Sequence, residues 1–134
     1  MCYILTIFRM LDKKNLTMKN LFILNGAPYG DERTYNGLRL AGALAKREGN
    51  QVRVFLMGDA AIAAKGGQKV PEGFYNVQVM LGRVTRAAVD AVGVCGTCMD
   101  ARGMKGDELM EGAHRGTLEE LADWSEWADK VFVF

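Results

Sequence analysis

The sequence is poor in histidine, proline and cysteine, and it lacks an excess of charge of either sign. Its 134 residues include one His, two Pro and three Cys, and 17 Lys and Arg stand against 16 Asp and Glu. A formal net charge of +1 gives no electrostatic reason to expect nucleic acid or an anionic membrane surface as a partner. Three cysteines do not make a secreted disulfide framework, so we expect a cytoplasmic protein whose thiols stay reduced.

Long hydrophobic runs are also missing. A helix needs roughly 18 consecutive apolar residues to span a bilayer, and no segment approaches that length. The apolar run from Cys2 to Phe8 is short, no basic segment precedes it, and Arg9 and Asp12 follow it, so it is a poor signal peptide. The sequence therefore predicts neither a membrane span nor a cleaved leader.

From Met18 onward, short apolar runs alternate with amphipathic stretches. The apolar runs predict strands buried on both faces of a parallel sheet, at 21–24, 52–57, 92–94 and 131–134. Helical patterns lie between them, at 31–48, 60–64, 75–91, 97–103 and 117–130. This order predicts right-handed crossovers within one three-layer α/β domain over residues 18–134. Residues 1–17 are interpreted as an extension, either from a misassigned start or as an added element at a sheet edge or subunit contact.

Three of the predicted helices begin with a capping residue. Asp31, Thr97 and Thr117 each precede a helical pattern and can accept a hydrogen bond from a free backbone N–H of the first turn. Glu120 follows Thr117 by three positions, which is the spacing of a capping box, and Asp100 gives Thr97 a weaker version. We therefore expect helices to start at these three residues.

The tetrapeptide Cys95-Gly96-Thr97-Cys98 follows the third predicted strand. In open parallel sheets, ligands and chemistry collect at the carboxyl ends of the strands. Asn25 and Asp59 come after the first and second predicted strands, so the same edge should carry them. The two cysteines are therefore predicted to lie where an α/β protein places its site.

The surroundings of Cys95 and Cys98 favour a reactive thiol. A thiol reacts as the thiolate, which the free amides and macrodipole of a helix N-terminus stabilise. Gly96 leaves the sulfur atoms uncrowded, and Arg102, one turn after Cys98, adds positive charge, whereas Asp100 opposes it. We expect the pKa of Cys95 to be lowered.

Other uses of the two cysteines stay open on these grounds alone. Free cysteine often packs as a small apolar residue. Zinc would gain ligands from Cys95, Cys98 and His114 but needs a fourth from Asp107, Glu108 or water, because no second CxxC or second His exists. No metal is therefore predicted. A thioredoxin-type role is not supported, because both prolines precede the motif and no proline follows it.

The segment from Val94 to Gly103 resembles the cysteine segment of DsrE/DsrF-like proteins, which include sulfur-relay subunits. Residues 25–30, 36–41, 55–60 and 121–134 agree with the same family in character. The resemblance implies a three-layer α/β/α fold around a largely parallel sheet of about five strands, and a homo-oligomer, either a trimer or a hexamer.

In the sulfur-relay branch of that family, a cysteine in this segment carries sulfane sulfur as a persulfide between donor and acceptor proteins, with no cofactor. Its spacing from Gly103 selects Cys95 here, and Cys98 is a departure that resolves the persulfide or forms a disulfide. Arg102 and the helix amides would stabilise the thiolate or persulfide. Asn25, Tyr29 and Asp59 would shape the pocket, unless they serve only the turns at the strand ends.

The alternative hypothesis to a sulfur carrier is a binding or redox-sensing module that is not an enzyme. It would be oligomeric and would respond to oxidation through a reversible Cys95–Cys98 disulfide. Trp127 lies off the apolar stripe of the last predicted helix, so it belongs either to a subunit contact or to its own domain.

Overall fold

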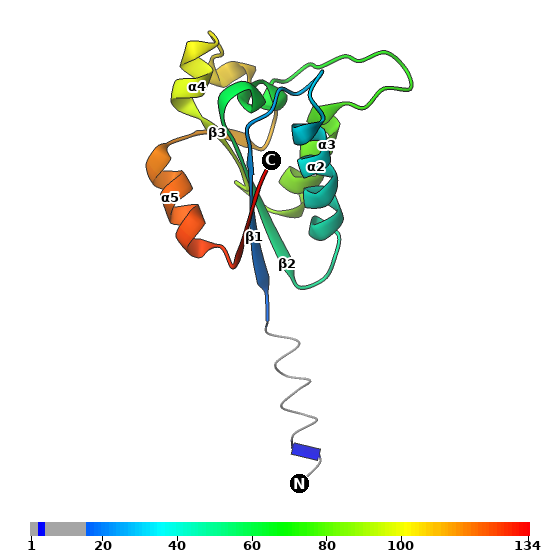
Figure 1. Ribbon diagram of the computed structural model, residues 1–134, viewed down its shortest axis with the longest axis vertical. Coiled ribbons are helices and arrows are strands. Elements are labelled where there is room, and N and C mark those ends of the chain that lie inside the picture. The colour runs from blue at the N-terminus through cyan, green and yellow to red at the C-terminus, as the bar shows by residue number, and fades with distance from the viewer. Residues whose placement is uncertain (1–2, 5–15) are drawn as a thin grey trace.

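A computed structural model describes residues 3–4 and 16–134 of the chain. Cys2 and most of the predicted extension over residues 1–17 lie outside the described residues. A five-stranded sheet stands between helices on both of its faces (Figure 1), which confirms the predicted three-layer α/β/α class. In the described part of the chain, no helix combines the length and apolar character that crossing a membrane requires.

All five strands of the sheet run parallel. They are β1 (Met18–Leu24), β2 (Asn50–Leu56), β3 (Val92–Cys95), β4 (Ala113–Gly116) and β5 (Lys130–Val133). Their order in the sheet is β4-β3-β2-β1-β5, so the chain moves outward from β1 to β4 and then returns to the other side of β1.

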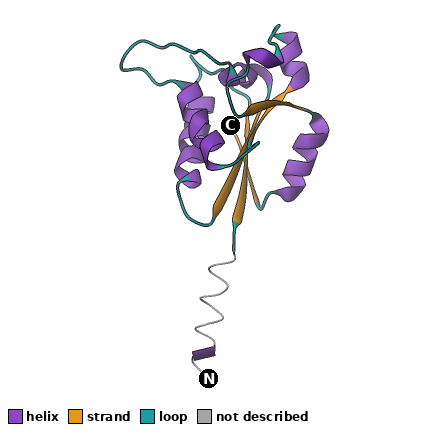
Figure 2. Ribbon diagram, turned by 180° about the vertical axis from the view of Figure 1, so that it is seen from behind, coloured by secondary structure: helices purple, strands orange, loops and turns teal. Residues whose placement is uncertain are grey.

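The reversal in strand order decides which helix covers which face. Right-handed crossovers that run in opposite directions along a sheet put their helices on opposite faces. Accordingly α2 (Glu32–Ala45) and α3 (Val77–Ala87) cover one face, and α5 (Leu118–Trp127) covers the other alone, as the reverse view in Figure 2 shows. The crossover from β3 to β4 holds only the short helices α4 (Gly96–Ala101) and η2 (Gly106–Glu108).

The predicted strands are all present, and β4 is an addition that no apolar run indicated. Its four residues, Ala113–Gly116, include a histidine and an arginine, because only the last of them is buried and a strand that is not buried on both faces needs no continuous apolar run. The short helix predicted at 60–64 is a 3₁₀ helix, η1 (Gly58–Ala64). The helix predicted over 75–91 is shorter than expected, because Asn76 caps its start and it ends at Ala87.

Two of the three predicted N-caps are confirmed. The Asp31 carboxylate accepts a hydrogen bond from the Arg33 amide at 2.9 Å, and the Thr117 hydroxyl accepts one from the Glu120 amide at 3.1 Å. The prediction for Thr97 was wrong, because β3 continues directly into α4 and Cys95 occupies the cap position. Thr97 therefore lies inside the first turn of α4.

The two faces of the sheet carry cores of unequal size. Under α2 and α3 lies a large apolar cluster that includes Phe22, Leu38 and Val54. Under α5 the buried cluster consists of Leu21, Phe55, Leu121 and Trp124. Among the described residues a single helix covers this second face, so Val131 and Val133 of β5, beside it, stay exposed. The candidate site lies on the same face.

Candidate functional site

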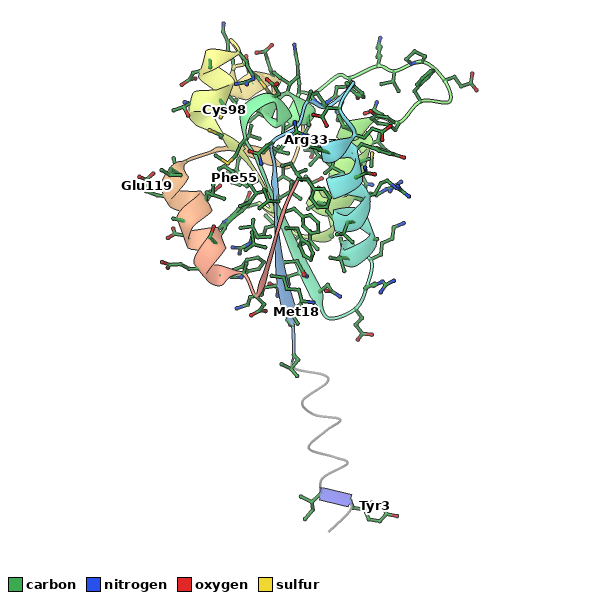
Figure 3. All side chains as sticks on the ribbon, in the orientation of Figure 1. Tyr3, Met18, Arg33, Phe55, Cys98 and Glu119 are labelled. Carbon is green, nitrogen blue, oxygen red and sulfur yellow. The ribbon has the colours of Figure 1, made fainter. Side chains whose placement is uncertain are left out.

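Cys95 and Cys98 lie at the carboxyl end of the sheet, as predicted. Cys95 is the last residue of β3 and Cys98 belongs to the first turn of α4. Figure 3 shows Cys98 at the opposite end of the sheet from Met18, the first residue of β1. Both thiols are free and half-buried. The strand-to-helix turn therefore presents two sulfur atoms at the edge where the strands end.

Each sulfur atom has its own set of hydrogen-bond partners. Cys95 Sγ accepts a hydrogen bond from the Cys98 amide at 3.4 Å and lies 3.3 Å from the Thr97 hydroxyl oxygen. Cys98 Sγ accepts a hydrogen bond from the Gly58 amide, at the start of η1, at 3.2 Å. The turn after β2 is thereby joined to the turn after β3.

These contacts give the two thiols different pKa values. Burial raises the pKa of Cys95, but hydrogen bonds from the Cys98 side chain, the Thr97 hydroxyl and the backbone amides of both outweigh it, so the pKa is lowered. Burial and the hydrogen bond to Cys95 raise the pKa of Cys98, against the opposing effects of the Gly58 amide and Arg102. Cys95 therefore ionises first and is the better nucleophile of the pair.

Arg102 acts next to Cys98 rather than next to Cys95. Its guanidinium binds the Asp59 carboxylate, with Nη2 2.7 Å from Oδ1, and donates to the Cys98 carbonyl oxygen at 3.0 Å. The Asp59–Arg102 pair ties η1 to α4 beside the motif. Asp59 is thus brought to the cysteines as predicted, but by way of Arg102.

Sequence reasoning missed a second arginine, Arg115 on β4. It forms two parallel hydrogen bonds of 2.8 Å with the Asp100 carboxylate, and this contact lowers the pKa of Asp100. A Cβ on Gly96 would lie 2.8 Å from Cζ of Arg115, so the glycine lets the guanidinium rest against the backbone of the motif. Arg115 could not be found because β4 itself was not predicted.

A cavity of about 530 Å³ opens beside the two cysteines on the α5 face. Its walls come from the ends of β2, β3 and β4 and from the first turns of α4 and α5. The lining residues are Phe55, Met57, Cys95, Gly96, Thr97, Cys98, Arg115, Gly116, Thr117, Leu118, Glu119 and Leu121. Gly96 and Thr97 therefore lie at the cavity beside the two cysteines, whereas the contribution of α5 was not foreseen.

Asn25, Tyr29 and Asp59, which were expected to shape the pocket, do not line this cavity. Asn25 binds the carbonyl oxygen of Phe134 through its backbone and side-chain nitrogen atoms, so it fastens the end of β1 to the last residue of the chain. The Tyr29 hydroxyl hydrogen-bonds to Gln68 and accepts from the Val77 amide. Asn25 and Tyr29 stabilise neighbouring turns.

His114 does not join the cysteines. Its Nε2 lies 2.7 Å from Glu120 Oε1, and its ring meets the edge of the Trp124 ring. Within residues 3–4 and 16–134, no three His, Cys, Asp or Glu side chains gather closely enough to hold a metal ion. The arrangement with zinc between Cys95, Cys98 and His114 is therefore absent from the described part of the chain.

Trp127 packs within its own domain. The Arg53 guanidinium from β2 lies 4.0 Å from the centre of the Trp127 ring and also faces Trp124 at 5.2 Å. The side chain is half-buried by this stacking. This contact supports packing of Trp127 within its own domain rather than at a subunit contact.

Sequence and structure similarity identify the relatives of the chain. Residues 18–134 match the DsrE/DsrF-like family. Protein YchN of Escherichia coli is 49% identical over 117 residues, which cover 87% of this chain and 98% of that protein. The uncharacterized protein MJ0989 of Methanocaldococcus jannaschii is 37% identical over 117 residues, which cover 87% of this chain and all of that protein.

A solved structure of a relative has the same fold as this chain. The crystal structure of the ychN protein from E. coli matches with a TM-score of 0.81 and 45% sequence identity, over 88% of this chain and 100% of that one. Similarity of this extent over nearly the whole described domain shows common descent as well as a common fold. The chain belongs to the DsrE/DsrF-like family.

Proposed function

We propose that the protein is a sulfurtransferase-like carrier in which Cys95 holds sulfane sulfur as a persulfide. The supporting observation is the lowered pKa of Cys95 at the mouth of a cavity large enough for a sulfur-bearing group. The Cys95 thiolate attacks the outer sulfur of a donor persulfide, the donor S–S bond breaks, and the donor leaves as a thiol after it takes up a proton. Passage to an acceptor repeats the same exchange, with Cys95 as the leaving group.

The neighbours of Cys95 take supporting roles in this proposal. Thr97 and the Cys98 amide stabilise the thiolate before attack, since both lie within hydrogen-bond distance of its sulfur atom. Cys98 acts as the resolving thiol when no acceptor is present: it attacks the inner sulfur of the persulfide, forms the Cys95–Cys98 disulfide and releases the outer sulfur as sulfide. The Asp59–Arg102 pair fixes α4, and Asn25 and Tyr29 support the adjoining turns.

Intact mass spectrometry after exposure to a persulfide donor tests the proposal. Cys98→Ser, which lacks the resolving thiol, should gain one sulfur atom, and Cys95→Ser should gain none at this site. The wild-type chain should pass from the persulfide to the Cys95–Cys98 disulfide as Cys98 resolves it. If Cys95→Ser accepts sulfur as fully as Cys98→Ser, Cys95 is not the carrier.

A second candidate is a thiol–disulfide switch without sulfur transfer. The closeness of the Cys98 amide and side chain to Cys95 Sγ favours it, because a disulfide needs only a short movement of the two side chains. Under mild oxidation the switch predicts a loss of two hydrogen atoms that requires both cysteines, with no sulfur gained from a persulfide donor. The mass of Cys98→Ser therefore separates the two candidates, because this variant gains one sulfur atom if the protein is a carrier and none if it is a switch.

We further propose that residues 18–134 act as one domain, with residues 1–17 as an extension. The domain works in the cytoplasm as a homo-oligomer, a trimer or hexamer, with separate donor and acceptor proteins. Support for the oligomer comes from the family and from the exposed apolar strip that Val131 and Val133 of β5 form on the α5 face.

A further inference from the structure

The base of the cavity beside Cys95 is apolar. Phe55 and Leu121, which line it, are only 1% and 8% exposed, and Met57 is half-buried next to them. Their side chains come from the end of β2 and from α5. A group that enters the cavity therefore contacts apolar side chains at its base. Binding of an apolar group is favoured there, because burial of apolar surface is favourable.

Leu118 extends this apolar surface to the rim. It stands three positions before Leu121 on α5, so both side chains lie on one stripe of the helix. Leu121 is covered by the sheet, whereas Leu118 lines the cavity and is 71% exposed. The apolar stripe of α5 thus continues past the protein core and along one wall of the cavity.

The charged side chains that line the cavity do not favour an anion. Of the described residues that line it, Arg115 is the one cation, and both of its terminal nitrogen atoms bind Asp100. Glu119 lies on the rim, in the first turn of α5. An anionic ligand would lose hydration next to the Glu119 carboxylate and would have to share Arg115 with the Asp100 carboxylate that it already binds.

We propose that this cavity binds the organic group R of a persulfide R–S–SH, and that R is uncharged and apolar next to its sulfur. The inference rests on the proposed function of Cys95. With R against Met57 and Leu118, the outer sulfur reaches Cys95 at the mouth of the cavity. The new bond joins Cys95 Sγ to that sulfur, the donor S–S bond breaks, and R–S takes the electron pair and a proton, so no net oxidation occurs. Thiosulfate and glutathione persulfide, which carry negative charge, are poor donors.

Thiol-modification rates test the cavity without any sulfane sulfur. The full chain with Cys2→Ser and Cys98→Ser leaves Cys95 as its one thiol for methyl, butyl and sulfonatoethyl methanethiosulfonates. Each rate is divided by the rate of the same reagent with N-acetylcysteine amide. We expect the butyl reagent to exceed the methyl reagent by up to about fourfold per buried methylene, and the sulfonatoethyl reagent to be slowest. Equal normalised rates, or a preference for the sulfonate, overturn the inference.

A rim substitution provides the matched control. Leu118→Lys, at an exposed position, should reduce the butyl preference and speed the sulfonatoethyl reagent. Val89→Lys, at a site 90% exposed on the turn before β3, should change neither rate. If both substitutions act alike, the cavity does not select the reagent.

Two sources of an apolar R are then compared in sulfur transfer to Cys95. The donors are the persulfides of butanethiol and of the peptide acetyl-Leu-Cys-Leu-amide, with thiosulfate as the charged reference. Faster transfer from either apolar donor supports the inference, and the faster one names the source as a small molecule or a protein segment. Faster transfer from thiosulfate overturns it. If no donor loads Cys95 while the alkyl preference persists, the sulfur-carrier function fails and the apolar cavity stands.

Discussion

At the level of single residues, Cys95 and Cys98 differ in which hydrogen bonds they accept and donate. Cys95 Sγ receives hydrogen bonds from residues on α4, which favour its thiolate. Cys98 donates toward Cys95 and accepts only the Gly58 amide, so its thiol form is favoured. The order of ionisation is therefore a property of the pair, and a change at one cysteine shifts the pKa of the other.

Substitutions at Cys98 test this coupling. Cys98→Ala removes a hydrogen-bond donor to the Cys95 thiolate and should raise the pKa of Cys95, whereas Cys98→Ser keeps a hydroxyl donor and should leave it lower. Both variants also carry Cys2→Ser, so that Cys95 is the one thiol left. Because the thiolate is the reactive form, the rate of iodoacetamide alkylation then rises with pH through the pKa of Cys95. We expect the midpoint to move to higher pH in Cys98→Ala than in Cys98→Ser. Coincident midpoints in the two variants would show that Cys98 does not set the ionisation of Cys95.

Single residues also show why part of the site could be predicted from the sequence and part could not. Cys95 ends an apolar run, so its place at the carboxyl edge followed from the strand pattern. Tyr29 follows β1 in the same way, but the chain there turns toward α2 and contacts the start of α3. The cavity lies on the α5 face instead. The position of a residue after a strand predicts at which end of the sheet it lies. It does not predict on which face of the sheet its side chain lies.

At the level of elements, β4 is the strand that no sequence pattern predicted, and it carries Arg115. It lies parallel to β3, with Gly93 paired with His114 and Cys95 paired with Gly116. Gly93 and Gly116 leave room for α5 on this side of the sheet, because a Cβ on either would lie within 3.0 Å of both Glu120 and the Phe55 ring. Such glycines can be recognised only once the strands are placed beside each other.

Gly93→Ala should therefore destabilise the contact between the sheet and α5. The added Cβ would lie 2.7 Å from Glu120 Oε1 and 3.0 Å from Cδ2 of the buried Phe55 ring. Overpacking of this kind typically lowers the free energy of unfolding by about 1–3 kcal/mol. Equilibrium urea unfolding followed by circular dichroism measures the change.

Gly106→Ala is the matched control for this substitution. A Cβ on Gly106 has no heavy atom within 4 Å, and the backbone there is not left-handed. We expect its free energy of unfolding to stay within about 0.5 kcal/mol of the wild type. If Gly93→Ala is as stable as Gly106→Ala, α5 does not pack on the sheet as closely as described.

At the level of the whole molecule, the return of the chain from β4 to β5 leaves the α5 face incompletely covered by residues 16–134. Val131 and Val133 on β5 pair with Leu21 and Ile23 of β1 and are 47% and 66% exposed. The order of the elements could be predicted from the alternating pattern. The bare strip could not, because it depends on β5 lying beside β1 rather than beside β4.

This bare strip is where we expect copies of the chain to meet. An exposed apolar surface on an edge strand is typical of a contact between proteins. Residues at the centre of such an interface are rarely charged. Val133→Glu should therefore reduce the particle mass seen by light scattering after size-exclusion chromatography. Val89→Glu, at an isolated position that is 90% exposed, should leave that mass unchanged. If Val133→Glu keeps the wild-type mass, the subunits meet elsewhere. If it falls to a single chain, the open α5 face joins the subunits next to the Cys95 cavity, because Ile23 and Met57 continue the strip from β5 toward Cys95.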